Sequence, residues 1–306
     1  MSERYPKIRF YQTFDDKQYL RIRESVCICF YMRRPHREIS QEVLRSLEIY
    51  RQAIGYEKLA WYPDDQGDWQ ELDAKGWELH RSEILDPRGC TIWLDETPNS
   101  VTGYKFTYRG WPLEALPFNR DPGVVCTVAF WLPTEFLEAQ GPARVRELAL
   151  ELGSRLPFSS GHAGLCFQFP DQVLGYSEYL RELCFRYPGM DMPLTDSIHL
   201  NLGLRINGVH WMNFLGQPVL GRLGGAAGLR ARLHSPGTTV QELQAERAVV
   251  TLGEWPEAGD LEQGQTLPAY RELAQLLKPW RYRLRKRYWS GFSEEDVRKW
   301  DRRFLD

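Results

Sequence analysis

The segment Ser159–Gly164 carries the pair of residues with the clearest catalytic character, because Ser160 stands two positions before His162. A serine and a histidine that meet in space beside an orienting carboxylate can carry out acyl transfer. Gly161 and Gly164 also indicate a tight turn that leads into a strand at residues 165–169, and we favour this structural interpretation. A hydrolase with a Ser160/His162 site is kept as an alternative function.

No other local sequence motif indicates a catalytic, cofactor or metal site. We therefore predict a protein that is not an enzyme and holds no cofactor. No two of the six histidines fall within four residues of each other, which removes the usual local pair of metal ligands. His199 and His210 could approach each other across a turn at Asn207-Gly208, but the sequence nominates no further ligands there. Phosphate-loop, dinucleotide and zinc-protease motifs are also missing. The six cysteines stand among apolar residues, which is typical of reduced structural thiols.

Two segments combine carboxylates with tryptophan and contain no basic residue, namely residues 61–73 and 253–262. Unpaired carboxylates are costly to bury, so both segments should lie at the surface. Tryptophan is enriched at protein interfaces, and acidic residues steer a basic partner. A plain alternative is a solvated turn whose tryptophan folds back onto the core. The predicted partner-binding residues are Asp64, Asp65, Asp68, Trp69, Glu254, Trp255, Glu257, Asp260 and Glu262.

The opposite pattern occurs at Lys278–Trp289, where six basic residues and four aromatic rings occur without an acid. Such interleaving can bind single-stranded nucleic acid through phosphate pairing and base stacking. It equally fits an amphipathic strand with a charged outer face. Nucleic-acid binding through this segment is therefore a second alternative function, and we do not favour it.

Strands and helices that alternate along the chain must position these residues. Residues 21–32 predict a strand, residues 40–55 an amphipathic helix, and residues 58–62 a short strand. The same order of strand, helix and strand is predicted for residues 124–132, 141–153 and 164–169. This suggests an internal duplication of a strand–helix–strand unit. The prediction is an α+β (mixed α/β) fold with mixed or antiparallel sheets and flanking helices. Its parts are residues 1–120, residues 121–280 packed on them, and residues 281–306.

Two further strand predictions concern the second half of the chain. Residues 197–206 alternate apolar and polar side chains, and Asn207-Gly208 is a strong signal for a hairpin turn into residues 209–215. Residues 229–233 and 248–252 are also predicted as strands.

The overall charge argues against a polyanion-binding coat. The chain of 306 residues has 39 Lys and Arg against 41 Asp and Glu, a net charge of −2. A protein that binds nucleic acid along its whole surface would carry a strong excess of positive charge. The first ten residues lack the apolar run of a secretory signal. The chain also contains no stretch of about 18 apolar residues, the length needed to cross a membrane. We therefore expect a cytoplasmic protein with no membrane partner.

Six short segments, in this order along the chain, resemble the type VI immunity family of bacteria: Tyr31–Pro35, Trp131–Phe136, Pro157–Gly164, Arg186–Asp191, Phe214–Pro218 and Leu252–Asp260. The similarity extends from about residue 20 to residue 280. It implies a cytosolic protein that binds and neutralises a cognate type VI secretion toxin, often a nuclease. It implies no catalytic residues. Joined to the acidic loops, it predicts that the chain occludes the active or DNA-binding site of such a nuclease. Neither the toxin, the face that binds it nor the oligomeric state follows from the sequence.

Overall fold

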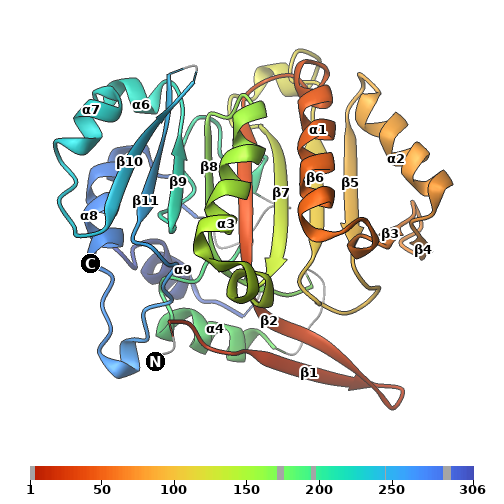
Figure 1. Cartoon of the computed structure of the whole chain (residues 1–306), viewed down its shortest axis with the longest axis horizontal. Helices are drawn as coiled ribbons and strands as arrows, with labels where there is room; N and C mark the ends of the chain where they lie inside the picture. Colours follow the sequence, from red (N-terminus) through yellow and green to blue (C-terminus); the bar gives the residue numbers. More distant parts are fainter. Residues whose placement is uncertain (1–3, 171–175, 194–197, 245, 285–290) are drawn as a thin grey trace.

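A computed structural model of the chain describes residues 4–170, 176–193, 198–244, 246–284 and 291–306. The strands join in one antiparallel sheet in the order β10-β11-β9-β8-β2-β7-β6-β5-β3-β4, and β1 pairs with β2 beside this path (Figure 1). The predicted α+β class with antiparallel pairing is confirmed. The strands are β1 (Arg9–Phe14), β2 (Lys17–Met32), β3 (Trp61–Pro63), β4 (Trp69–Glu71), β5 (Cys90–Asp95), β6 (Lys105–Gly110), β7 (Cys126–Pro133), β8 (Ser160–Gln168), β9 (Met212–Leu215), β10 (Thr238–Leu243) and β11 (Arg247–Leu252).

The described α-helices are α1 (His36–Ile54), α2 (Ala74–Leu85), α3 (Thr134–Arg155), α4 (Ser177–Arg186), α6 (Val219–Arg222), α7 (Gly225–Arg230), α8 (Pro268–Leu277) and α9 (Glu294–Asp301). Helices α1 and α3 pack side by side on one face of the sheet (Figure 1). In α1 the residues Ile39, Val43, Leu47 and Tyr50 recur every three or four positions and are all buried, so one stripe of the helix faces the sheet. None of the described helices is long and apolar enough to cross a lipid bilayer.

The central strands are buried on both faces, which explains their nearly continuous apolar sequences. Ile28 and Phe30 of β2 belong to the core beneath α1 and α3. Cys27, Cys29 and Tyr31 alternate with them and belong to a smaller core on the opposite face. The strands β7 and β8 flank β2, and every residue of both is buried, so the sheet's centre is shielded from water on both faces.

Both predicted strand–helix–strand units are present in the predicted order. Their first strands, β2 and β7, are antiparallel neighbours. β8 ends the second unit next to β2, whereas the first unit ends in the three-residue β3 near the far edge. Because β2 lies between two strands of the second half, residues 1–120 and 121–280 share one sheet. The boundaries at residues 120 and 280 stay a prediction.

Two local predictions are wrong. The described residues 198–206 form turns rather than a strand, so Asn207-Gly208 does not join a hairpin. The Asn207 side-chain amide instead donates a hydrogen bond to the Tyr31 hydroxyl at 2.9 Å. Residues 229–233 overlap the end of α7 and the turn after it, and the strand predicted at 248–252 is β11.

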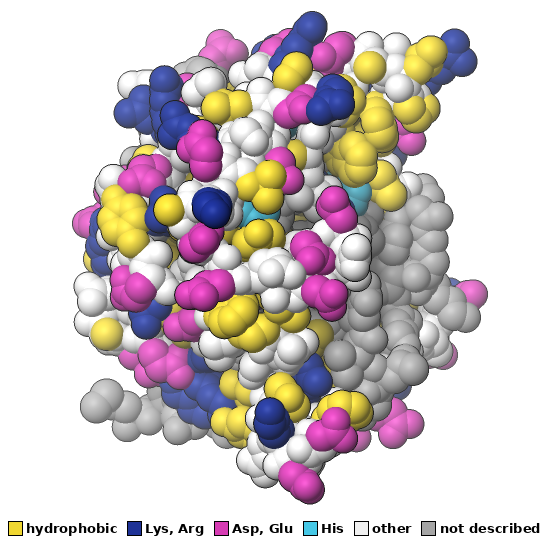
Figure 2. All heavy atoms as spheres, turned by 90° about the vertical axis from the view of Figure 1, so that its right-hand side faces the viewer, with side chains coloured by type: hydrophobic (Ala, Val, Ile, Leu, Met, Phe, Trp, Pro, Cys, Tyr) yellow, Lys and Arg dark blue, Asp and Glu magenta, His cyan; other side chains and the backbone are white. Residues whose placement is uncertain are grey.

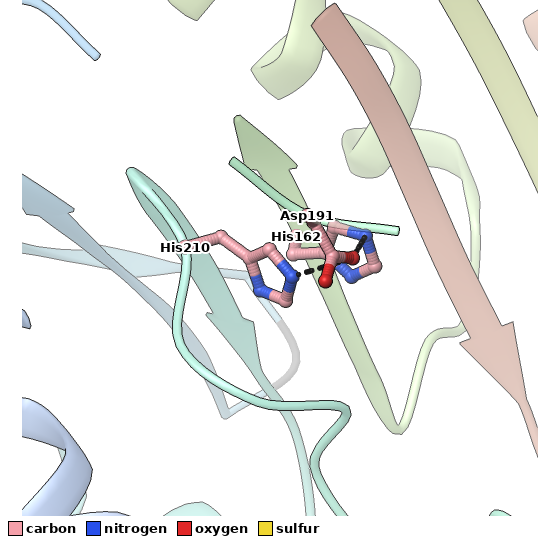
Figure 3. Close-up of side chains that lie close together, drawn as sticks. All are labelled: His162, Asp191 and His210. Atoms are coloured by element: carbon pink, nitrogen blue, oxygen red, sulfur yellow. Dashed lines mark ion pairs between the residues drawn. The ribbon is translucent and has the colours of Figure 1, made fainter. Parts of the chain in front are cut away.

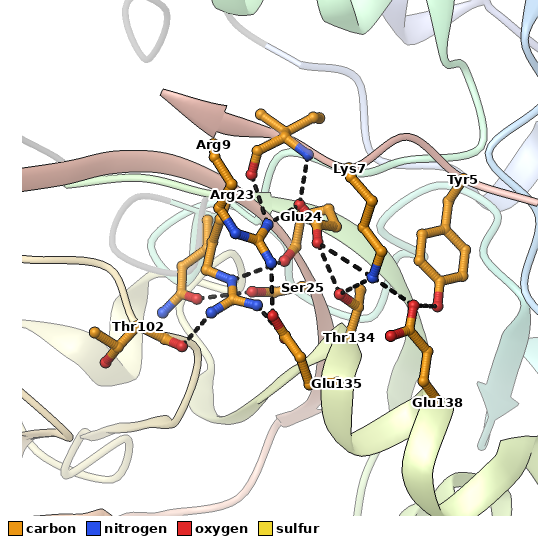
Figure 4. Close-up of polar contacts among 12 residues, drawn as sticks. Tyr5, Lys7, Arg9, Arg23, Glu24, Ser25, Thr102, Thr134, Glu135 and Glu138 are labelled. Atoms are coloured by element: carbon orange, nitrogen blue, oxygen red, sulfur yellow. Dashed lines mark hydrogen bonds and ion pairs between the residues drawn. The ribbon is translucent and has the colours of Figure 1, made fainter. Parts of the chain in front are cut away.

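A buried polar network joins the N-terminal strand to the middle of the sheet and to α3 (Figure 4). Its centre is Glu24, whose side chain has no exposed surface. One carboxylate oxygen accepts hydrogen bonds from the Ile8 backbone N–H at 2.7 Å and from Arg9, and the other accepts one from the Thr134 hydroxyl at 2.8 Å. The network therefore holds β1 against the sheet through a charged group that is fully enclosed.

Candidate functional site

The hairpin of β3 and β4 carries the first acidic segment, and Asp64 builds its turn. One Asp64 carboxylate oxygen accepts hydrogen bonds from the backbone N–H groups of Gln66 and Asp68, each at 3.0 Å. The other accepts one from the Gln70 amide at 2.8 Å. These hydrogen bonds, with that from Asp68 the strongest cause, lower the pKa of Asp64. Asp64 is therefore a structural residue of the loop as well as a source of negative charge.

The remaining acids of the hairpin face solvent. Asp65, Asp68 and Glu71 are exposed, and no salt bridge between described residues involves them. Asp73, also exposed, accepts a hydrogen bond from the Gly76 N–H at 2.8 Å and so caps the start of α2. Figure 2 shows acidic side chains interspersed with hydrophobic ones across the middle of this end of the molecule. The hairpin thus presents carboxylates that no base of the described chain neutralises.

Trp69 stands beside these acids in a fixed position. Its indole is partly exposed, and its Nε1–H donates a hydrogen bond to the Asn99 side-chain oxygen at 3.2 Å. The edge of one ring meets the face of the other in its contact with Trp93, with the centroids 6.5 Å apart. Lys105 lies over Trp93 at 3.9 Å from the ring centroid. Asn99 and Trp93 therefore fix the position of the Trp69 indole. Trp69 belongs to neither buried core.

The second acidic segment, residues 253–262, is used largely within the protein. Trp255 packs against the main core, and the Arg4 guanidinium lies 4.9 Å from its ring centroid. Asp260 is buried and pairs with Arg186 through two hydrogen bonds of 3.0 and 2.7 Å, which lower the pKa of Asp260. Glu262 pairs with the same guanidinium at 2.7 Å. The expectation of surface exposure is therefore wrong for Asp260, whose charge is neutralised by Arg186.

Glu254 and Glu257 are exposed, and neither forms a salt bridge with another described residue. The structure does not bring the two segments together. The hairpin lies at the β4 edge of the sheet, whereas residues 253–262 follow β11, next to the opposite edge (Figure 1). One compact partner surface can therefore cover one of the two segments, and we treat them as separate candidates.

The Ser160/His162 pair of the alternative hydrolase is buried in β8. The Ser160 hydroxyl donates its hydrogen bond to the Arg205 carbonyl oxygen at 3.1 Å, and the residue is 1% exposed. His199 stacks on Trp111, with ring centroids 5.5 Å apart, instead of meeting His210. His210 stacks on His162, and both rings approach Asp191 (Figure 3). Residues far apart in the sequence form this cluster, so local spacing gave no signal for it.

The basic-aromatic segment is packed where the structure describes it. Arg281 is largely buried and pairs with Asp301 at 3.1 Å, and Tyr282 is buried in the smaller core. The Arg222 guanidinium lies 5.0 Å from the Trp280 ring centroid. Trp280, Arg281 and Tyr282 are thus engaged within the protein, whereas Lys278 and Arg283 are exposed. Residues 285–290 of this segment lie outside the described residues.

Comparisons with known proteins agree with the resemblance seen in the sequence. The family profile TsiV, described as type VI immunity for VRR-NUC, matches residues 42–304. A solved structure described as Pseudomonas aeruginosa T6SS protein PA0821 is similar in fold, with a TM-score of 0.75 and 17% sequence identity. The similarity covers 97% of this chain and 87% of that one. A comparison with curated protein sequences finds no match.

Proposed function

The chain belongs to the TsiV family of type VI immunity proteins, and from this premise we propose that it neutralises a VRR-NUC nuclease toxin by binding it through the β3–β4 hairpin. The observation that supports this choice is the set of exposed, unneutralised carboxylates of Asp65, Asp68 and Glu71 beside the partly exposed indole of Trp69. The prediction of an immunity protein is confirmed at the level of the family.

A nuclease must hold the phosphate backbone of its substrate in a basic groove. An inhibitor that fills this groove needs carboxylates opposite the basic residues and a rigid aromatic side chain to anchor the contact. Trp69 meets the second requirement, since its indole is fixed by Asn99 and Trp93 before any partner arrives. The proposed mechanism is therefore occlusion of the DNA-binding or active site.

Residues 253–262 are the second candidate for the same contact. Asp260 and Glu262 share Arg186, and Arg4 covers one face of Trp255, so a basic partner would have to compete with groups of the chain itself. Glu254 and Glu257 remain exposed and keep this candidate in the test. We rank the hairpin first because its negative charge is available without any rearrangement.

The test measures the affinity of the purified chain for the VRR-NUC toxin encoded beside its gene. Trp69→Ala should weaken Kd by about 30-fold, which corresponds to about 2 kcal/mol for a central aromatic residue. Asp65→Lys combined with Asp68→Lys should slow association and reverse the salt dependence of the rate. Glu242→Lys changes an exposed acid on β10, at the opposite edge of the sheet, and serves as the control that keeps the wild-type affinity.

Trp255→Ala is measured in parallel for the second candidate. If only Trp255→Ala weakens binding, the contact lies at residues 253–262 and the hairpin proposal is wrong. If Trp69→Ala and Trp255→Ala both keep full affinity, neither acidic segment is the central contact, although the family assignment would stand.

The proposal also makes the chain a stoichiometric inhibitor rather than an enzyme, acting in the cytoplasm where the DNA substrate of a nuclease lies. Nuclease activity should fall linearly with added chain and reach its minimum at one chain per toxin. Complete inhibition by far less than one equivalent would instead indicate catalytic destruction of the toxin and would contradict this part of the proposal.

A further inference from the structure

A second polar site lies on the face of the sheet opposite α1 and α3, and its three residues are buried. His162 belongs to β8, where it pairs in register with Cys29 of the smaller core. Asp191 forms a β-bridge with Cys166 of the same strand, and His210 lies two residues before β9. His162 and His210 are each 3% exposed and Asp191 is 8% exposed. Three separate chain segments therefore place titratable side chains at one buried position.

The three side chains converge on a single carboxylate oxygen. The imidazole rings stack with their centroids 3.8 Å apart and their planes 13° from parallel. The Nε2 atom of His210 lies 3.0 Å from Asp191 Oδ2, and the Nε2 atom of His162 lies 4.0 Å from it (Figure 3). All three ligand-type atoms lie within 4.8 Å of one another.

Hydrogen bonding within the described chain leaves these atoms without partners. Neither Nε2 atom nor Asp191 Oδ2 has a hydrogen bond of acceptable geometry, although the 3.0 Å separation of His210 and Asp191 is short enough for an ion pair. Buried polar atoms in proteins nearly always have a partner, so three such atoms aimed at one point call for an explanation.

We propose that His162, Asp191 and His210 bind one divalent metal ion, for which zinc is the best fit. Zinc bonds of 2.0–2.2 Å in tetrahedral geometry place neighbouring ligand atoms about 3.4 Å apart. The observed separations of 3.0 and 4.0 Å lie on either side of this value. The stacked rings would have to turn toward each other to direct both Nε2 lone pairs at one ion. Two imidazoles and one carboxylate are also a ligand set that zinc accepts.

Arg303 is the positioning residue for this site. Its guanidinium lies 3.5 Å from Asp191 Oδ1, the other carboxylate oxygen, and its Nε–H donates a hydrogen bond to the Pro188 carbonyl at 2.9 Å. Carboxylate ligands are commonly oriented by such a hydrogen-bonding neighbour. The metal would thereby connect β8, the turn after α4, the segment before β9 and the C-terminal end of the chain. Because its three residues are buried, the role of the site is structural.

The test purifies the full chain without a histidine tag and measures its metal content by elemental analysis. About one zinc per chain is expected, and removal by a chelator should lower Tm by about 4 °C relative to protein in zinc chloride at about 100 times Kd. His210→Gln and Asp191→Asn should bring the zinc content close to zero. His234→Gln, a change at an exposed histidine, is the matched control and should keep it.

Wild-type protein that neither contains zinc nor gains stability from added zinc chloride would overturn the proposal. So would zinc retained by both ligand variants, because the ion would then lie elsewhere. If those variants fail to fold, cobalt substitution of the wild type decides the matter: the strong visible absorption of four-coordinate cobalt with nitrogen ligands is expected, and a weak six-coordinate spectrum would contradict the site.

Discussion

Glu24→Ala should destabilise the protein by about 4 kcal/mol, because it removes the buried carboxylate at the centre of the network that holds β1. The substitution deprives two enclosed donors, the Ile8 N–H and the Thr134 hydroxyl, of their acceptor. A buried donor without a partner costs about 1–3 kcal/mol, which gives about 4 kcal/mol for two. The lost pair with Arg9 adds little to this cost, because the Arg9 side chain is 30% exposed and keeps its pair with Glu135.

The effect should appear in urea unfolding and in thermal scans. Unfolding entropy of about 2.1 cal/mol/K per residue over this chain converts 4 kcal/mol into a fall in Tm of about 6 °C. Glu24→Gln should cost less, about 1–2 kcal/mol, because the amide oxygen can accept from Ile8 while the amide nitrogen donates to the Thr134 hydroxyl.

Glu138→Ala is the matched control, since Glu138 contacts Lys7 in the same network but its side chain is 44% exposed. Its loss should cost less than about 1 kcal/mol. A Glu24→Ala protein within about 1 kcal/mol of the wild type would refute the reasoning. An equally large effect of Glu138→Ala would also refute it, because burial would then not determine the size of the loss.

Two further predictions concern acids in contrasting surroundings. Burial, partly offset by Lys105, raises the pKa of Asp95 to about 6, so the folded state holds this proton more tightly than the unfolded state does. Wild-type stability relative to Asp95→Asn should therefore fall by up to about 3 kcal/mol as the pH rises from about 4 to 7, as measured by urea unfolding at both values; a difference that does not vary with pH would contradict the assignment. Asp260→Asn should weaken the pair with Arg186 and cost about 1–3 kcal/mol. If the hairpin is the toxin contact, this variant keeps its toxin affinity within about twofold, and a tenfold loss in a calorimetric titration would point to residues 253–262 instead.

The parts of the fold that could be predicted from the sequence are those in which one local pattern decides the structure. The strand predicted at residues 21–32, whose residues 26–32 are all apolar, lies within the buried part of β2, and the three-to-four spacing from Val43 to Ile54 became the inner stripe of α1. Asn207-Gly208 failed as a hairpin signal because the Asn207 amide bonds to Tyr31 of β2, and Ile206 forms a β-bridge with Arg281. A contact with a residue 176 positions away cannot be inferred from turn propensity.

The candidate sites likewise differ in whether local sequence or distant contacts determine them. The sequence shows that residues 61–73 contain acids without bases, and the hairpin retains this property because no distant base folds onto it in the described chain. In residues 253–262 the same composition has a different outcome, since Arg186 arrives from α4 and neutralises Asp260. The His162–Asp191–His210 cluster forms only because the fold brings together three chain segments that are distant in the sequence. Local composition therefore predicts exposure only where the tertiary structure adds no partner.

The acidic hairpin has a second physical explanation that has to be separated from toxin binding. β4 is an edge strand, and short, charged edges discourage pairing with the sheets of other molecules. Protection of an edge depends on the presence of charge, whereas attraction to a basic groove depends on its sign. Asp65→Lys with Asp68→Lys keeps the edge charged and reverses the sign, while Asp65→Asn with Asp68→Asn removes the charge. If the hairpin only protects the edge, the Lys variant keeps the wild-type oligomeric state and toxin affinity, and the Asn variant alone aggregates. If it binds the toxin, the Lys variant keeps the wild-type oligomeric state but loses affinity more severely than the Asn variant, because repulsion is added to the lost attraction.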